Sequence, residues 1–231
     1  MTNLFQNVFF LNPYVVMRYM LATGQPSGSG VRTEIVDLSD PSKSCLLEDI
    51  SYRFYSAGGL LESTPIICGG HDGNDWLNEC LLYGTSQEIY MNSKRTGHSL
   101  VALNDSEIWV TGGSYGNRLD TTEFITADGA VNGPTLPEAV EFHCTVKFAE
   151  NVYLIGGDTN YGATNNVWVA NPSNGHIFLQ GPSLITKRYH HGCGTMSIGA
   201  KSIIVAAGGC CNYLSSVEIL DPLSNQWVAG K

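Results

Sequence analysis

The stretch SIIVAAGGCCNYLSSVEILDPLSNQW, residues 202–227, decides the fold. An apolar run at 203–207 ends in Gly208-Gly209, and a polar loop follows. A second run, 217–220, leads through a turn to Trp227. Short apolar runs bounded by Gly, Asn, Asp and Pro are typical of β-strands joined by turns. The stretch therefore predicts a strand, a tight glycine turn, a loop, a second strand and an aromatic anchor.

The same unit recurs when the chain is aligned on its double glycines, at spacings of 43, 44 and 52 residues. A repeat of this length indicates propeller blades or a solenoid. Glycine is required where the backbone turns tightly with positive φ and neighbours approach closely. The pairs are Gly69-Gly70, Gly112-Gly113, Gly156-Gly157 and Gly208-Gly209.

Each unit predicts three strands around its glycine pair. A weaker fifth copy, without one glycine, lies at 20–24 and 33–38, whereas Gly58-Gly59 lacks a full apolar run before it and is interpreted as a hairpin turn. The strands before the glycines are 65–68, 108–111, 152–155 and 203–207; those after them are 79–83, 122–125, 166–169 and 217–220; and first strands are expected at 97–103, 142–148 and 191–196.

Composition excludes several classes of protein. The 231 residues suffice for one all-β domain or two small ones, and no long segment has apolar residues at helical spacing. The formal charge is −9 and Lys and Arg are scattered, so the basic patch that a nucleic acid or an anionic membrane requires is missing. We interpret the acidity as a solubility feature rather than as attraction of basic partners.

Residues 1–19 form a poorly defined segment or a truncated start. They hold an apolar run without a basic beginning, interrupted by Pro13 and carrying Arg18, so they make a poor signal peptide and too short a membrane span. The repeat region is expected to occupy residues 20–231.

Seven cysteines occur without any CxxC or zinc-finger spacing, so no metal site is predicted. Cys68 ends one strand and Cys80 lies in the next, so the two can face each other across a hairpin, with Cys45 as a rival partner for Cys68. Cys144 and Cys193 occupy matching first-strand positions in adjacent units, which is a reason to pair them. The odd total leaves a free thiol, expected in Cys210-Cys211.

These features together resemble the Kelch repeat. The repeat carries an Arg and an aromatic residue or His before its first strand, which KRTGH at 94–98 and KRYHH at 187–191 match. The tract RYHHGCG at 188–194, with GPSL at 181–184 ahead of it and CGG at 68–70, is similar to Kelch-type proteins of invertebrates thought to be secreted. The resemblance covers about residues 20–231, although the repeat's Trp is clear only at Trp227.

The resemblance implies an all-β Kelch-type β-propeller with about four complete blades and a partial one. Because the family's propellers have six or seven blades, it also implies a fragment of a six-bladed propeller or a truncated gene model. An open gap or a poorly packed junction is then expected between the first and last blades.

A Kelch propeller implies a non-catalytic scaffold that recognises another protein through its loops, with no cofactor, no nucleic acid and no membrane insertion. Arg95, Arg188, His98 and His191 are expected to be structural, and Glu34, Glu123 and Glu218 recur at one structural position. The aromatic and Arg side chains of the loops after the glycine pairs are the candidate binding residues: Trp76, Tyr115, Arg118, Tyr161 and Tyr213.

Two other functions stay open. Galactose-oxidase-like copper enzymes use a Kelch-type propeller with two His and two Tyr around copper, one Tyr being linked to Cys. Here Tyr189, His190, His191 and Cys193 have that composition, but adjacent residues of an extended segment point to opposite faces. The second is the substrate-recognition part of a ubiquitin-ligase adaptor whose helical BTB and BACK domains are missing from this chain.

The cysteine pairing and the sequon Asn104-Asp105-Ser106 favour an extracellular, secreted protein over a cytoplasmic one.

Overall fold

The computed structural model describes strands at residues 7–8, 19–24, 32–37 and 45–47, and the chain at 53–198, 201–210, 213–221 and 223–230. Side chains are described from residue 53 onward. Most of the predicted segment 1–19 therefore lies outside the described residues.

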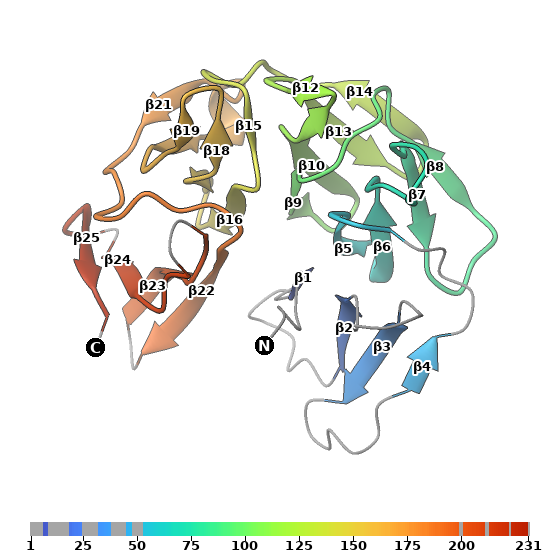
Figure 1. Ribbon diagram of the computed structural model, residues 1–231, viewed down its shortest axis with the longest axis horizontal. Coiled ribbons are helices and arrows are strands. Elements are labelled where there is room, and N and C mark those ends of the chain that lie inside the picture. The colour runs from blue at the N-terminus through green and yellow to red at the C-terminus, as the bar shows by residue number, and fades with distance from the viewer. Residues whose placement is uncertain are drawn as a thin grey trace.

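Five four-stranded antiparallel sheets, here sheets 1 to 5, follow one another around a common centre (Figure 1). Each is a meander in which successive long strands pair. Sheet 1 comprises β1 (Asn7–Val8), β2 (Tyr19–Gly24), β3 (Arg32–Asp37) and β4 (Cys45–Leu47); sheet 2, β5 (Ala57–Leu61), β6 (Thr64–Cys68), β7 (Glu79–Leu82) and β8 (Glu88–Tyr90); sheet 3, β9 (Ser99–Asn104), β10 (Glu107–Thr111), β13 (Thr122–Thr126) and β14 (Gly129–Asn132); sheet 4, β16 (Cys144–Phe148), β17 (Asn151–Ile155), β20 (Val167–Ala170) and β21 (Phe178–Gln180); and sheet 5, β22 (Gly192–Ile198), β23 (Lys201–Ala207), β24 (Val217–Asp221) and β25 (Gln226–Ala229).

Smaller elements lie in the loops. They are β11 (Ser114–Tyr115), β12 (Asn117–Arg118), β15 (Val140–Glu141), β18 (Asp158–Thr159), β19 (Gly162–Ala163) and the 3-10 helix η2 (Pro172–Asn174). No α-helix occurs in the part of the chain that the structure describes, and none of its helices is long and apolar enough to cross a membrane.

The predicted all-β class is confirmed, and the strands around the glycine pairs begin and end within two residues of the predicted ranges. The fifth copy also forms strands, β2 and β3. The interpretation of Gly58-Gly59 as a hairpin turn is wrong. Both residues lie inside β5, and the turn is Glu62-Ser63, whose φ angles are 50° and 66°. A Cβ on Gly59 would lie 2.6 Å from Leu100 Cδ2, so glycine here allows the first strand of the next sheet to pack against β5.

Three apolar clusters fill the spaces between neighbouring sheets, and the first strands β5, β9, β16 and β22 contact one another in that order. The cluster between sheets 2 and 3 includes Ile66 and Ile108, that between sheets 3 and 4 Trp109 and Leu154, and that between sheets 4 and 5 Ile155 and Trp227. Trp227, the predicted anchor, is buried and its indole N–H donates to Pro182 O at 2.9 Å.

Gly112 shows why the glycine pairs recur. Its φ is +57°, and a Cβ there would lie 2.4 Å from Val140 O and 2.9 Å from His143 Cε1. The segment that leads into the first strand of the next sheet therefore packs directly on this backbone, which leaves no room for a side chain.

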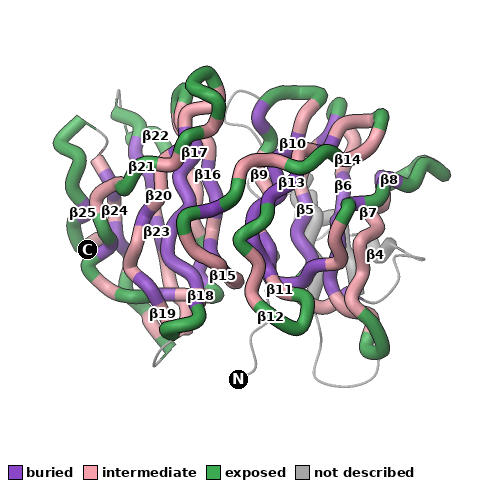
Figure 2. Tube along the Cα trace, turned by 90° about the horizontal axis from the view of Figure 1, so that it is seen from above, coloured by how far each residue is buried: buried purple, intermediate pink, exposed green. Residues whose placement is uncertain are grey.

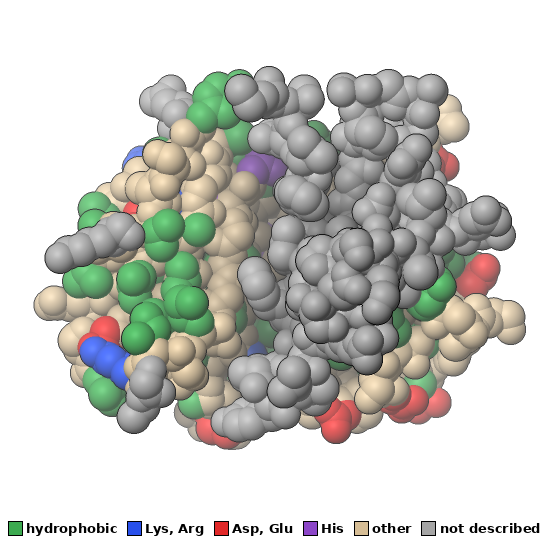
Figure 3. Space-filling model, turned by 90° about the horizontal axis from the view of Figure 1, so that it is seen from below, with side chains coloured by type: hydrophobic (Ala, Val, Ile, Leu, Met, Phe, Trp, Pro, Cys, Tyr) green, Lys and Arg blue, Asp and Glu red, His purple; other side chains and the backbone are tan. Residues whose placement is uncertain are grey.

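The outer face of sheet 5 is apolar and partly open. Ile66, Trp109 and Tyr153 each stand three residues before the first glycine of their unit, and each is buried against the following sheet. Val205 has the same position in sheet 5 but is only half-buried. By strand register, Met196, Ile198 and Val228 share the face of Val205, and each is half-exposed or more. Hydrophobic side chains gather on this part of the surface (left in Figure 3).

Candidate recognition face

The loops after the glycine pairs lie together at one end of the molecule. Figure 2 shows β11, β12, β15, β18 and β19 gathered at its lower end. Bridges tie these loops to the segments that lead into the first strands, since Phe54 pairs with His71 and Thr96 with Ser114. We call residues 53–56, 95–98, 140–143 and 188–191 the lead-in segments. Together with the loops they form the recognition face.

Buried arginines fix the lead-in segments. Arg95 is fully buried and donates through Nη1 to Gly112 O at 2.7 Å and Thr121 O at 3.1 Å, and through Nη2 to Glu123 Oε1 at 2.5 Å. The Glu123 carboxylate also accepts from the backbone N–H groups of Asn92 and Ser93. The charge of Arg95 is thus paired with that of Glu123 within the fold, as the predicted structural roles of the two residues require.

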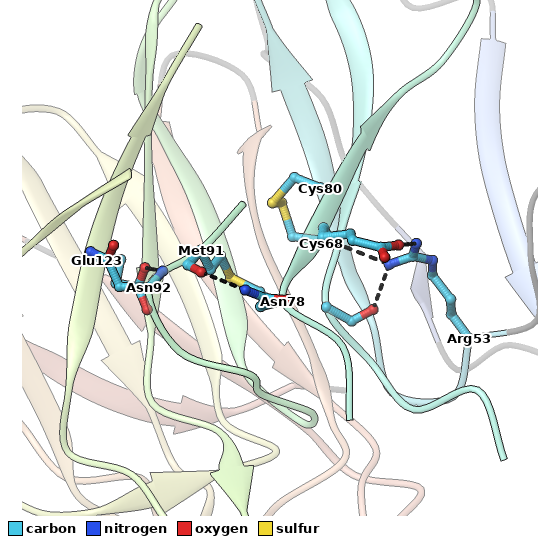
Figure 4. Close-up of a disulfide and its surroundings, with 9 residues drawn as sticks. Arg53, Cys68, Asn78, Cys80, Met91, Asn92 and Glu123 are labelled. Carbon is cyan, nitrogen blue, oxygen red and sulfur yellow. Dashed lines mark hydrogen bonds and ion pairs between the residues drawn. A yellow bond between two sulfur atoms is a disulfide. The ribbon is translucent and has the colours of Figure 1, made fainter. Parts of the chain in front are cut away.

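The arrangement repeats in sheet 5 and, with a shift, in sheet 2. Arg188 donates to Gly208 O at 2.7 Å and to Glu218 Oε1 at 2.6 Å. Arg53 donates to Gly69 O at 3.2 Å and Glu79 Oε2 at 2.7 Å, beside the paired Cys68 and Cys80 (Figure 4).

Sheet 4 has no such pair. Val140 takes the place of the arginine, and Trp168 takes the place of Glu123 opposite its partner strand. The Trp168 indole N–H instead donates to Glu138 Oε1 at 2.8 Å. In sheet 4 the ion pair is therefore replaced by a buried apolar residue, Val140, and by a hydrogen bond from an indole N–H to a carboxylate.

Three histidines stand at equivalent positions beneath the face. His98, His143 and His191 are buried, and each imidazole packs on the first glycine of the preceding sheet, 2.8–3.0 Å from the position a Cβ would take. Burial lowers the pKa of each to about 3. They are therefore neutral wedges between sheets at physiological pH. His143 was not singled out from the sequence, because no arginine precedes it at the usual distance.

The residues directly before His98, His143 and His191 adopt a left-handed backbone conformation, and so does Tyr55 in the corresponding lead-in segment of sheet 2. The φ angles are 53° at Tyr55, 62° at Gly97, 55° at Phe142 and 52° at His190. Backbone hydrogen bonds link them in succession: Gly97 N–H donates to Tyr55 O at 2.9 Å, Phe142 N–H to Gly97 O at 2.7 Å, and His190 N–H to Phe142 O at 3.0 Å. This conformation is uncommon for large residues and is found where the surrounding structure enforces it.

The side chains at these positions form an aromatic cluster. Phe142 and His190 stack with ring centroids 3.7 Å apart, and Tyr55 meets Phe142 edge-on at 5.1 Å. Gly97 makes this possible, since a Cβ there would lie 2.7 Å from the Phe142 ring. Desolvation lowers the pKa of His190, against the opposing charge of Asp158. Sequence reasoning missed this cluster, although Phe142 and His190 each directly precede one of the histidines.

A cavity of about 320 Å³ adjoins the cluster, lined by Phe54, Tyr55, His71 and Thr96. Beyond it, Trp76 contacts His71 at 5.1 Å and Tyr115 at 5.5 Å between ring centroids, both edge-on. The structure thus brings together two of the predicted binding residues, Trp76 and Tyr115, from loops of adjacent sheets.

The other three predicted binding residues lie apart. Arg118 forms ion pairs with Glu141, at 3.2 Å, and with Asp158, so it braces sheets 3 and 4. Tyr161 and Tyr213 project from their loops, with 99% and 88% of their surface exposed.

Both expected cysteine pairs lie at disulfide distance. Cys68 and Cys80 face each other across β6 and β7, and Cys144 and Cys193 join the first strands of sheets 4 and 5. Cys210 is a free thiol, while Cys211 and the side chain of Cys45 lie outside the described residues.

The residues considered for copper are used differently. Cys193 is paired with Cys144, His190 stacks on Phe142, and His191 is buried against Gly156. Within the described ranges, no group of three His, Cys, Asp or Glu side chains is placed to hold a metal ion.

Comparison with models of protein families gives a match to the last repeat of the chain. The model of the Kelch motif matches residues 200–230. This segment contains β23 to β25, which form the repeat unit first identified at residues 202–227. The match therefore supports the Kelch-repeat family. A search of curated proteins finds no match to the chain.

Proposed function

We propose that the protein is a non-catalytic recognition module that binds another protein through the recognition face. The observation that carries the proposal is the set of aromatic side chains, from Phe142 and Tyr55 to Trp76 and Tyr115, held at one end of a rigid β frame. Recognition residues usually lie on loops that a rigid scaffold positions, and aromatic residues dominate interface energies. The Kelch motif is consistent with such a scaffold.

The frame supports this role because its buried guanidinium groups are already bound within their own sheets. The buried Arg–Glu pairs bind backbone carbonyls of their own sheet, and the Arg118 brace links two loops. Loops fixed in this way lose little conformational entropy on binding, which favours affinity.

Site-specific photo-crosslinking tests the proposal. A benzophenone amino acid is placed at Tyr115 or Tyr161 on the face, and at Val131 or Leu179 on the outer strands, which are similarly exposed apolar controls. We expect one shared protein adduct from the two face positions in the protein's native medium and no adduct from the controls. Adducts from the outer strands alone would contradict the proposal.

We further propose that residues 20–231 form one propeller and that a further blade packs against the outer face of sheet 5. The half-buried Val205, at a position that is buried in three other sheets, supports this. The test is to measure the oligomeric state of the isolated chain and of its Val205→Lys variant by sedimentation. We expect the wild-type chain to associate through this face and the variant to stay monomeric. A wild-type chain that is a monomer with one cooperative melt would show that the propeller closes by itself.

We also propose a secreted, extracellular location, on the strength of the two cysteine pairs at disulfide distance. Thiol counting in denaturant without reductant tests it. One to three free thiols support secretion, and seven would place the protein in the cytoplasm.

A further inference from the structure

The aromatic groups of the recognition face form one continuous strip. It runs from His190 and Phe142 through Tyr55 to the cavity beside His71, and from there to Trp76 and Tyr115. Apart from His71 and Trp76, which share one loop, neighbouring members of the strip come from different segments of the chain. The strip therefore exists only in the folded frame, and a ligand can contact several rings at once.

Three of its residues hold an unfavourable backbone conformation in order to present their rings. Tyr55, Phe142 and His190 all have φ above 50°, where the fourth equivalent residue is Gly97. A large residue in this region costs of the order of 1–3 kcal/mol. The fold accepts glycine at this position in sheet 3, so the aromatic side chains are not needed to complete the turn. Strain of this kind typically occurs at ligand-binding sites.

The charged side chains beside the strip carry a net negative charge. Lys94 pairs with Asp75, but no cation pairs with Asp72 among the described residues, and backbone N–H donors lower the pKa of Asp72. At the end of the strip formed by Phe142 and His190, the single guanidinium of Arg118 faces two carboxylates. One is Glu141, which directly precedes Phe142, and the other is Asp158, which acts electrostatically on His190. Each end thus carries one uncompensated negative charge.

Aromatic faces flanked by carboxylates are the environment that attracts organic cations, because the ring quadrupole and the carboxylates act in the same direction. The lowered pKa of His190 keeps its ring neutral at pH 7, so it does not repel a cation. An acidic ligand would meet the same groups unfavourably.

We propose that the strip binds a lysine or arginine side chain presented by an extended segment of a partner protein, with Tyr55 and Phe142 as the main contacts. This rests on the proposed recognition function and specifies the chemistry of its partner.

Selection from random decapeptides displayed on phage, with the whole chain as target, tests the proposal. We expect the enriched peptides to share a Lys or Arg. The most enriched one is synthesised and its binding measured by fluorescence anisotropy at two salt concentrations. Replacement of an Arg by the neutral isostere citrulline, or of a Lys by norleucine, should weaken binding about tenfold.

The protein variants are Tyr55→Gly and Phe142→Gly, since glycine keeps the backbone conformation that Gly97 already shows. His176→Gly is the matched control, because His176 also has a positive φ, 60°, and packs its ring on Trp109 and Phe124, but lies outside the recognition face. We expect a loss of about tenfold for each strip variant and none for the control, with unchanged circular dichroism.

The possible outcomes separate the cationic ligand, the strip as a binding site and the recognition function from one another. Enriched peptides without basic residues that still lose affinity on Tyr55→Gly would overturn the cationic ligand and leave the recognition face intact. Peptides that bind Tyr55→Gly and Phe142→Gly as tightly as the wild type, or no enrichment at all, would overturn the strip as a binding site. Photo-crosslinks confined to the outer strands would contradict the recognition function itself.

Discussion

Arg95→Met should destabilise the protein far more than loss of an exposed charge. The substitution removes a guanidinium that donates to Gly112 O, Thr121 O and Glu123, and it leaves Glu123 charged and 1% exposed. Breaking a buried ion pair from one side costs about 3–5 kcal/mol, because the remaining charge stays buried without its partner. Two backbone N–H donors to Glu123 remain, which places the expected cost near the lower end, about 3 kcal/mol.

Arg118→Met is the matched control. Arg118 also contacts two partners through its guanidinium, but its side chain is 27% exposed, so we expect a loss of only about 1 kcal/mol. The free energy of unfolding is measured in urea, followed by the fluorescence of the four tryptophans.

A second pair of variants separates charge from packing. Arg95→Val with Glu123→Trp reproduces the combination that sheet 4 carries at Val140 and Trp168, and should be less destabilised than Arg95→Val alone. If Arg95→Met costs no more than Arg118→Met, the buried arginines do not hold the lead-in segments and the reasoning fails.

Two further predictions concern stability. Burial lowers the pKa of His98, His143 and His191 to about 3, whereas the same side chains titrate at about pH 6.5 in the unfolded chain. The unfolded chain therefore binds more protons at acidic pH. Stability should be nearly constant above about pH 7.5 and fall below it toward pH 3, by about 4 kcal/mol at pH 5.5 relative to pH 8. Urea midpoints across this range measure the fall, His143→Gln should remove about a third of it, and a flat profile would contradict it. Replacing Cys144 and Cys193 by serine opens a link across a sequence separation of 49 and should cost about 4 kcal/mol. Reductant should then destabilise the variant less than the wild type, because only the Cys68–Cys80 pair remains to be opened. An unchanged midpoint would show that the pair is not bonded in solution.

The repeat was readable from the sequence because glycine is the only residue that fits where the next sheet packs on the backbone, as at Gly112. The same preference for glycine led to the wrong prediction of a turn at Gly58-Gly59. These residues lie inside a strand, where Gly59 allows Leu100 to approach the backbone closely. A glycine pair alone does not distinguish these two uses.

The recognition face was only partly predictable. Trp76 and Tyr115 were identified from their residue types in loops, but their contact depends on how adjacent sheets pack. Arg118 also has the residue type of an interface anchor, yet its position between Glu141 and Asp158 makes it a brace. The left-handed conformation shared by Tyr55, Phe142 and His190 leaves no mark in residue type, since only Gly97 carries the usual signal.

Amide hydrogen exchange of the protein with and without an enriched peptide tests the recognition face most directly. We expect slower exchange at residues 53–56, 71–78, 95–98 and 140–143, which lie along the aromatic strip. Exchange should be unchanged in the turns at 104–107 and 148–151, between the first two strands of sheets 3 and 4. Protection confined to those turns, with the lead-in segments unaffected, would contradict the assignment of the binding surface to this end of the molecule.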